Sequence, residues 1–231
     1  MSKIRKVLGL PAELWCLLVT WLPGSVGSYL RFHYWRRRLK ILGAGTRIDA
    51  GVHIQNPEWV TIGADSWIDR NVLILAGPPR GDRHPYTKEN PNFRHTIGEV
   101  VIGERTHIAV NCVLSGIGGI QIGDCVGVAS GAMVYSFSHH YKNLCEPADK
   151  HQYSFTPLAR PDQQAMVLGP VVLEDHTAVG LNAVVLPGVT LGRGSWLGCS
   201  AVLAKDVPDQ TVVSAGADAK TKSLADLTVK V

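Results

Sequence analysis

Two interruptions of an otherwise regular pattern hold the histidines best suited to chemistry. The first interruption spans residues 77–100, and the second spans residues 136–169 and begins with the letters SFSHHYKN. An imidazole titrates near pH 6.5, so its neutral form is available as a base at pH 7. The adjacent residues His139 and His140 therefore suit removal of a proton from a nucleophile such as a hydroxyl group.

Other reactive motifs are missing from the sequence. No G-x-S-x-G motif occurs, so direct attack by the acceptor is favoured over an acyl-enzyme intermediate. Neither a P-loop nor G-x-G-x-x-G is present, so use of ATP or NAD is not indicated. The five cysteines are widely spaced without a C-x-x-C pair, which argues against a disulfide framework and favours a reducing, cytoplasmic location.

The elements that must position these histidines repeat every six residues from Leu42 onward. Ile, Leu or Val begins almost every unit, as in IGERTH, IAVNCV and, later, LEDHTA, VGLNAV, VLPGVT. An α-helix repeats at 3.6 residues and a strand at two, whereas a six-residue unit describes short strands joined by turns. Three units make one turn of a triangular parallel β-solenoid, and the blocks predict about six such coils. A β-sandwich would not keep this register.

Composition agrees with a solenoid and sets its limits. The 231 residues include 24 Gly and 13 Pro, which supply turns, and only 7% aromatic residues, which suits a narrow aliphatic core. With 45% hydrophobic and 18% charged residues the chain is not disordered. We expect a helical segment over residues 1–41, the repeat domain over 42–220 and a tail over 221–231.

The repeats and the segment IAVNCVLSGIGGIQIGDCVGVASGAMVYSFSHHYKN resemble the hexapeptide-repeat acyltransferases. The likeness is greatest to the branch that O-acetylates sugars, including polysaccharide-biosynthesis acetyltransferases. The resemblance implies an all-β left-handed parallel β-helix with a short N-terminal helical appendage and two extruded loops. It also implies a homotrimer and direct acetyl transfer from acetyl-CoA to a sugar hydroxyl, without a metal. The acceptor would be a surface polysaccharide, a glycolipid or a precursor, including a lipid-linked saccharide.

The resemblance assigns roles in the acceptor site. His139 matches the catalytic base at the mouth of the extruded loop, and His140 and Tyr141 would contact the substrate. Asn111 matches a residue that faces the acceptor and orients it. From its residue type alone, Asn111 is equally suited to forming a turn.

The resemblance also places the donor along the last coils, between subunits. Small residues would let the pantetheine arm approach the backbone, and these are Gly180, Ala183, Gly198, Ser200 and Ala201. Lys205 and Lys220 would meet phosphates as point charges. The family's Gly-x-Pro-Ala-Lys ending reads Gly-Ala-Asp-Ala-Lys here, with Asp218 in place of proline, and this departure weakens the assignment of Lys220.

Three other functions are alternatives on the same coil. N-acetylation of an amino sugar or nucleotide sugar would use the same histidine. A zinc enzyme like the γ-class carbonic anhydrases would need three converging histidines, but the family's H-x4-H pair does not occur. A non-enzymatic scaffold would not account for the histidine loop. The nucleotidyltransferase fusions of this repeat need an N-terminal α/β domain, which 40 residues cannot hold.

The N-terminal segment carries most of the positive charge. Residues 1–40 hold eight basic residues and one acidic residue, a balance of +7, whereas the other 15 basic and 18 acidic residues leave −3 on the rest. A general nucleic-acid binder is therefore not expected. Apolar residues 7–22 are too few to span a bilayer, but with the basic aromatic stretch that follows they suit an anionic membrane surface. We expect either peripheral binding to the inner face of the cytoplasmic membrane or packing on the chain's own domain.

Overall fold

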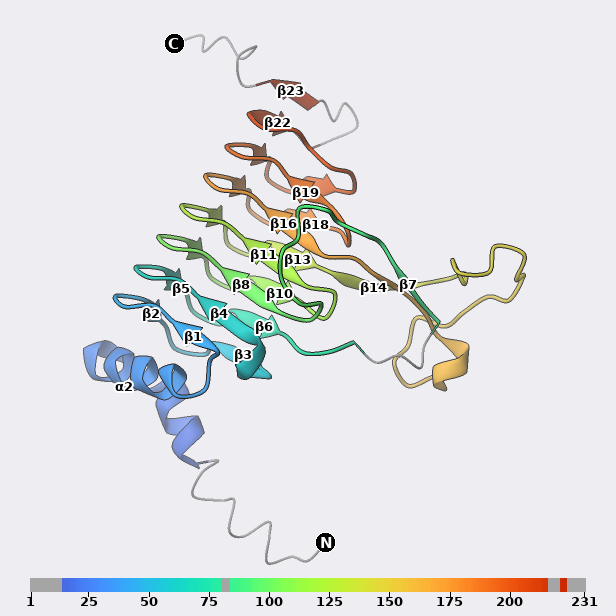
Figure 1. Ribbon diagram of the computed structural model, residues 1–231. Helices are drawn as coiled ribbons and strands as arrows, with labels where there is room; N and C mark the ends of the chain where they lie inside the picture. Colours follow the sequence, from blue (N-terminus) through green and yellow to red (C-terminus); the bar gives the residue numbers. More distant parts are fainter. Residues whose placement is uncertain (1–13, 80–83, 216–220, 224–231) are drawn as a thin grey trace, which may run out of the picture.

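The computed structural model describes residues 14–79, 84–215 and 221–223 as a stack of three-sided coils (Figure 1). Sheet A contains β1 (Ile41–Leu42), β4 (Val60–Ile62), β8 (Val100–Ile102), β11 (Ile120–Ile122), β16 (Val171–Leu173) and β19 (Thr190–Leu191). Sheet B contains β2 (Arg47–Ile48), β5 (Trp67–Ile68), β9 (His107–Ile108), β12 (Gly127–Val128), β17 (Ala178–Val179), β20 (Trp196–Leu197), β22 (Thr211–Val213) and β23 (Thr221–Ser223). Sheet C contains β3 (His53–Gln55), β6 (Leu73–Leu75), β10 (Val113–Ser115), β13 (Met133–Tyr135), β18 (Val184–Val185) and β21 (Val202–Leu203).

The chain visits sheets A, B and C in turn, so each coil contributes one strand to each face. Strands within the three sheets pair in parallel, except that β23 runs antiparallel to β22. The register places Ile62 beside Ile102 and Ile102 beside Ile122, and all three are almost fully buried. Similar aliphatic columns line the inside of sheets B and C. The six-residue period thus produces the triangular solenoid that it predicts.

The turns between sheets B and C, here called the B–C edge, use the left-handed backbone region. Asn71, Asn111, Asn182 and Ser200 have φ of 58°, 61°, 54° and 57°. Asparagine tolerates this conformation better than most side chains. The amide of Asn71 donates to Oδ1 of Asn111 on the next coil at 3.3 Å. These residues therefore form a ladder that turns the chain at each level.

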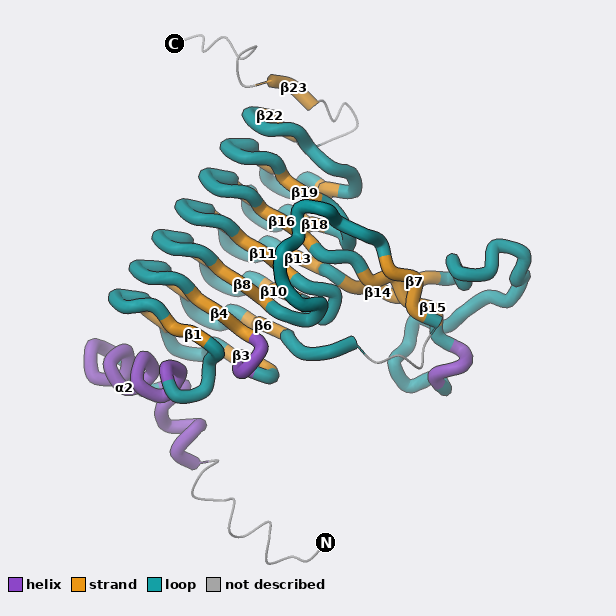
Figure 2. Tube along the Cα trace, in the orientation of Figure 1, coloured by secondary structure: helices purple, strands orange, loops and turns teal. Residues whose placement is uncertain are grey.

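The two interruptions leave the stack at the turns between sheets C and A, the C–A edge. The first contains β7 (Pro85–Thr87), and the second contains β14 (Phe137–His140) and β15 (Ala165–Leu168) with the 3-10 turn η2 (Pro161–Gln163) between them. β15 pairs antiparallel with β14 and parallel with β7. The two extruded segments thus form one small sheet, sheet D, beside the coils (Figure 2).

The N-terminal segment closes the first coil. Residues 14–21 are helical, and α2 (Gly24–Arg36) follows after a break at Pro23. Trp35 and Leu39 join the aliphatic core, and the 3-10 turn η1 (Pro57–Trp59) lies at the same end. Packing on the chain's own domain therefore holds for α2. No helix within the described residues combines the length and apolarity needed to cross a membrane.

Candidate active site

His139 is the third residue of β14, and its ring is held by a buried glutamine. Nε2 of His139 lies 3.3 Å from Oε1 of Gln164, which accepts its hydrogen bond. Gln164 is completely buried, and its Nε2 donates to the carbonyl oxygen of Ala159 at 2.6 Å. The second bond fixes the amide so that its oxygen faces the histidine. Nδ1 of His139 is then the nitrogen left to accept a proton.

His140 and Tyr141 lie beside His139 but have a different setting. The His140 ring stacks on the Tyr141 ring with centroids 4.7 Å apart. Nδ1 of His140 lies 2.9 Å from the carbonyl oxygen of Lys142 and 3.1 Å from its backbone nitrogen, so the Lys142 backbone holds this nitrogen in either tautomer. His140 is thus oriented only by the turn in which it lies, whereas His139 is oriented by a buried side chain. Tyr141 is exposed, which leaves it free to contact a ligand.

A polar cavity of about 520 Å³ lies in the second interruption and also touches His84 of the first. His151, Tyr153, Arg160 and Gln163 line it. The Tyr153 hydroxyl donates to Asp149 at 2.6 Å, and this bond is the main reason that the pKa of the Asp149 carboxyl is lowered and that of Tyr153 is raised. The cavity wall is thus braced by a hydrogen bond to a carboxylate.

A groove lies along the outside of sheet B. The cavity of about 370 Å³ has mostly apolar walls, formed by residues 127–129, 178–180 and 196–199 with His107. Gly127 and Ala178 carry little or no side chain, whereas His107 and Trp196 stand at the two ends. Three strand spacings separate these ends, so the gap is about 14 Å long. A Cβ added at Gly127 would meet no heavy atom within 4 Å.

The predicted donor residues divide between groove and core. Gly180 and Gly198 line the groove. Ala183 and Ala201 do not offer their side chains to it: both are buried in the aliphatic core, because the last residue of each B–C turn faces inward. That part of the prediction is corrected. Ser200 is exposed at the B–C edge, Lys205 is exposed on the turn after β21, and Lys220 lies outside the described residues.

The single chain does not bring the whole candidate site together. Asn111 lies on the B–C edge, one coil from Ala129 at the groove, and its backbone φ of 61° shows that it forms the turn. His139 lies beyond β13, on the C–A edge, at the opposite end of the sheet C strands. The candidate base therefore lies on the C–A edge, whereas the candidate donor groove lies on the outer face of sheet B.

Two contributors had no clear signal in the sequence. Gln164 precedes an ordinary apolar strand, and nothing in its neighbourhood marks it as the partner of His139. His107 stacks on Trp67 with centroids 4.7 Å apart and lies 3.6 Å from the Asp69 carboxylate. The outward position of each sheet B strand could have been read from the period, and it would have identified Gly127 as a gap.

A metal centre is not evident in the part of the chain that the structure describes. No group of three or more His, Cys, Asp or Glu side chains in residues 14–79, 84–215 and 221–223 is arranged to hold an ion.

Known proteins with similar folds identify this architecture. No family model matches the chain. A hexapeptide-repeat acetyltransferase of Vibrio cholerae, solved with acetyl-CoA, aligns over 98% of this chain and 92% of its own with 20% identity and a TM-score of 0.51. The fold is the left-handed β-helix of the acyltransferases. This likeness confirms the prediction that the chain folds as an all-β left-handed parallel β-helix.

Two further likenesses concern sugar-modifying enzymes. The N-acyltransferase AntD of Bacillus cereus, solved with dTDP-4-amino-4,6-dideoxyglucose and coenzyme A, aligns over 84% of the β-helix chain and 88% of its own, with 18% identity and a TM-score of 0.64. A dTDP-4-amino-4,6-dideoxy-D-glucose acyltransferase of Escherichia coli is 28% identical over 115 residues, which are 50% of this chain and 56% of that protein. The chain spans between about a quarter and about half of the curated relatives it matches.

Proposed function

We propose that the chain is an acetyl-CoA-dependent acetyltransferase that modifies a sugar hydroxyl of a surface polysaccharide, a glycolipid or a precursor. The observation that carries the proposal is the orientation of His139, whose Nε2 is held by Gln164 while Nδ1 is left as a base. The likeness to folds solved with coenzyme A supports the choice of donor.

The reaction needs one base and no covalent enzyme intermediate. Nδ1 of His139 takes the proton as the acceptor oxygen attacks the thioester carbonyl, and a carbon–oxygen bond forms. The tetrahedral intermediate then collapses, the carbon–sulfur bond breaks, and the imidazolium returns the proton to the thiolate. The products are an acetyl ester and free coenzyme A. A backbone N–H would most naturally meet the transient oxyanion.

The groove on sheet B has the shape that a pantetheine arm requires. It is long and narrow, and its floor lacks side chains at Gly127, so an extended chain can lie against the backbone. Gly180, Gly198 and Ser200 would contact the arm, and Lys205 and Lys220 would meet phosphates. Asn111, on the neighbouring coil, would donate its free Nδ2 to the acceptor, since its Oδ1 is occupied by Asn71.

A homotrimer would complete this site. His139 lies on the C–A edge and the groove on the outer face of sheet B, so in a shared site the C–A edge of one subunit would meet the sheet B face of the next. A cyclic trimer of three-sided prisms allows three identical contacts of this heterologous kind. Each site would then contain one subunit's His139 and the neighbouring subunit's groove.

N-acetylation of an amino sugar or nucleotide sugar is the second candidate. The names of two similar proteins favour it. The E. coli relative is named as an acyltransferase of an amino sugar nucleotide, and AntD is named as an N-acyltransferase. His139 would serve either acceptor. The two reactions give products of different chemistry, an ester or an amide.

An acceptor screen tests the proposal. Acetyl-CoA turnover is measured with simple sugars, nucleotide sugars, amino sugars and lipid-linked sugars. The product is then treated with alkaline hydroxylamine, which cleaves an ester but leaves an amide. A labile product on a sugar supports O-acetylation, whereas a stable product formed only with amino sugars supports the second candidate. No turnover with any acceptor would contradict both.

Subunit mixing tests the shared site. At acetyl-CoA concentrations below the wild-type KM, chains carrying His139→Ala and chains carrying Gly127→Phe are each expected to turn over at about one tenth of the wild-type rate or less, and both substitutions leave the core untouched. After unfolding and refolding together, mixed trimers would hold sites with an intact base and an intact groove, and activity should return. Mixtures that stay inactive although mixed trimers form would contradict the shared site.

A further inference from the structure

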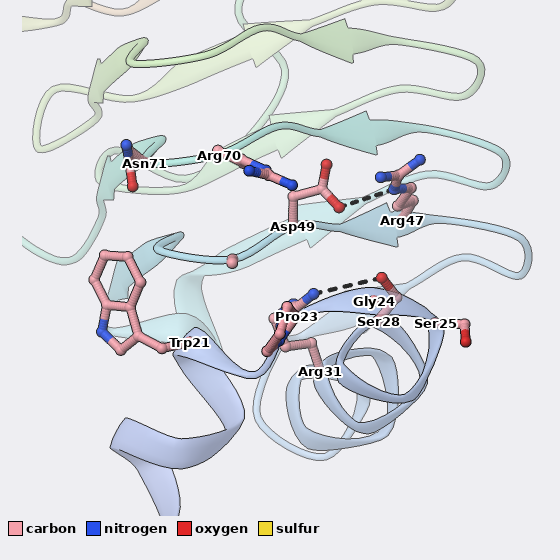
Figure 3. A pocket seen from close by; sticks show the side chains of 11 residues that line it. Trp21, Pro23, Gly24, Ser25, Ser28, Arg31, Arg47, Asp49, Arg70 and Asn71 are labelled. Atoms are coloured by element: carbon pink, nitrogen blue, oxygen red, sulfur yellow. Dashed lines mark hydrogen bonds and ion pairs between the residues drawn. The ribbon is translucent and has the colours of Figure 1, made fainter.

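A large cavity lies at the closed end of the coil, away from His139 and the groove. It occupies about 670 Å³ between the N-terminal helices and the first two coils. We call it the basal cavity, and Figure 3 shows its lining residues Trp21, Pro23, Gly24, Ser25, Ser28, Arg31, Arg47, Asp49, Ala50, Arg70 and Asn71. Three arginines and one carboxylate among them leave a net positive charge.

The buried arginine of this cavity, Arg31, has no direct ionic partner among residues 14–79, 84–215 and 221–223. Arg31 is 3% exposed, and its guanidinium donates to the carbonyl oxygens of Ile48 at 2.8 Å, Leu22 at 2.6 Å and Val19 at 3.3 Å. Burial is the main cause of the lowered pKa of Arg31, with nearby Asp49 acting in the opposite direction. The oxygens that accept hydrogen bonds from Arg31 are neutral, so they do not neutralise its positive charge. That charge therefore attracts anions in the cavity.

Both oxygens of Asp49, the one carboxylate among the lining residues, accept hydrogen bonds from other side chains. Asp49 Oδ1 accepts from Nε of Arg47 at 2.8 Å, and its Oδ2 accepts from Nε1 of Trp67 at 2.9 Å. The Arg47 guanidinium also lies over the Trp67 ring at 4.7 Å. The two terminal nitrogens of Arg47 therefore remain able to donate.

Further donors face the same space. The side chain of Arg70 forms no hydrogen bond or ion pair with any described residue, and Figure 3 shows it pointing into the cavity. The 13-residue helix α2 begins at the cavity wall with Ser25 in its first turn, without an acidic residue or a side-chain cap. Free guanidinium groups, a hydroxyl and helix N-terminal amides are donors that bind phosphate.

An apolar surface adjoins the cavity on the first helix. Leu14, Trp15, Leu17, Leu18 and Trp21 are each about half exposed, between 49% and 58%. Trp21 belongs to both features, because it also lines the cavity. Tryptophan with aliphatic residues next to cationic groups is the arrangement that partitions to the headgroup region of a bilayer.

We propose that the basal cavity binds the phosphate headgroup of an anionic lipid while the exposed side chains of residues 14–21 enter the adjoining acyl boundary. Arg47 and Arg70 contact the phosphate oxygens. The positive charge of the buried Arg31 guanidinium stabilises the bound anion electrostatically. The headgroup binds through specific hydrogen bonds inside a preformed cavity. This interaction differs from the non-specific attraction of a basic segment to a negative surface. This binding is independent of acetyl transfer.

Vesicle sedimentation with the full chain tests the proposal through a matched pair of variants. Arg70→Gln and Arg37→Gln remove the same charge, but only Arg70 lines the cavity, and Arg37 is exposed. The vesicles are phosphatidylcholine, alone or with about one third phosphatidylglycerol. Losing a charged hydrogen bond should lower the partition coefficient of Arg70→Gln about tenfold or more. General surface attraction should lower that of Arg37→Gln by about fivefold or less.

Two further measurements distinguish a lipid headgroup from a soluble phosphate compound as the ligand of the basal cavity. Leu17→Gln should weaken vesicle binding without affecting binding of glycerol phosphate, a soluble headgroup analogue. Equal losses in Arg70→Gln and Arg37→Gln would overturn the proposal. Saturable binding of inorganic phosphate or a nucleoside diphosphate without any binding to anionic vesicles would also overturn it, because the site would then serve a soluble ligand. Thermal melting confirms that each variant folds.

Discussion

Gln164 is fixed at both ends of its amide, and one of those ends fixes His139. Its Nε2 donates to Ala159 O at 2.6 Å, and its Oε1 accepts from Nε2 of His139 at 3.3 Å. The glutamine is completely buried, so its orientation is set by the fold rather than by solvent. This contact decides which ring nitrogen of His139 remains for proton transfer.

Replacing Gln164 by leucine should lower kcat with little change in the KM for acetyl-CoA. The imidazole loses its orienting acceptor, and hydrogen bonds to groups that become charged are worth about 1.5–3 kcal/mol, so the loss is about 10- to 100-fold. If kcat for Gln164→Leu stays at the wild-type value in a folded protein, Gln164 does not position the base.

Gly127→Phe should block the groove without disturbing the coil. A Cβ at this position meets no atom within 4 Å, so the ring would fill the gap between His107 and Trp196. We expect the KM for acetyl-CoA to rise by about tenfold or more, as expected when about 1.4 kcal/mol of binding is lost. Gly127→Ala is the control and should behave like the wild type. An unchanged KM for Gly127→Phe would place the donor elsewhere.

Asn111→Gly separates the turn role from the acceptor role. Glycine keeps the backbone φ of 61° without strain, so the free energy of unfolding should change by about 1 kcal/mol or less. Acetyl transfer should nevertheless fall by about tenfold, because the amide that meets the acceptor is lost. Asn71→Gly breaks the same side-chain hydrogen bond one coil away and serves as the control. Equal activities of the two variants would leave Asn111 with only a turn role.

Cysteine alkylation should distinguish the core from the groove. Burial raises the pKa of the Cys112 thiol to about 11, so at pH 8 only about one thiol in a thousand is the reactive thiolate. Cys145 and Cys199 are exposed and should react first. Because Cys199 lines the groove, acetyl-CoA should slow its alkylation but leave Cys145 unaffected. Mass spectrometry of labelled peptides measures both, and equal rates with and without acetyl-CoA would count against donor binding there.

The six-residue period was sufficient to predict the coil because it reports inward-facing positions directly. Ile62, Ile102 and Ile122 recur at the first residue of their units and stack in the core. The period also predicts whether each turn residue faces the core or the outside of the coil. Ala183 faces the core, whereas Gly180 lines the groove on the outside. The corrected expectation for Ala183 and Ala201 came from treating the five small residues alike, although two of the five face the core.

Sheet D could not be predicted from the sequence. β7 pairs with β15 about 80 residues later, and neither segment carries the repeat that sets register elsewhere. The partner of His139 depends on that pairing, since Gln164 immediately precedes β15. The base was thus identified by its residue type and by resemblance, whereas its orientation required the folded chain.

Comparison of His139→Ala with His140→Ala is the most direct test of the account. Acetyl transfer is measured at saturating donor and acceptor, and acetyl-CoA binding is measured separately by calorimetry. Loss of a positioned base should lower kcat about 10²- to 10⁴-fold in His139→Ala with donor binding intact, while His140→Ala retains most activity. Full activity in His139→Ala, or loss confined to His140→Ala, would contradict the assignment of His139 as the base.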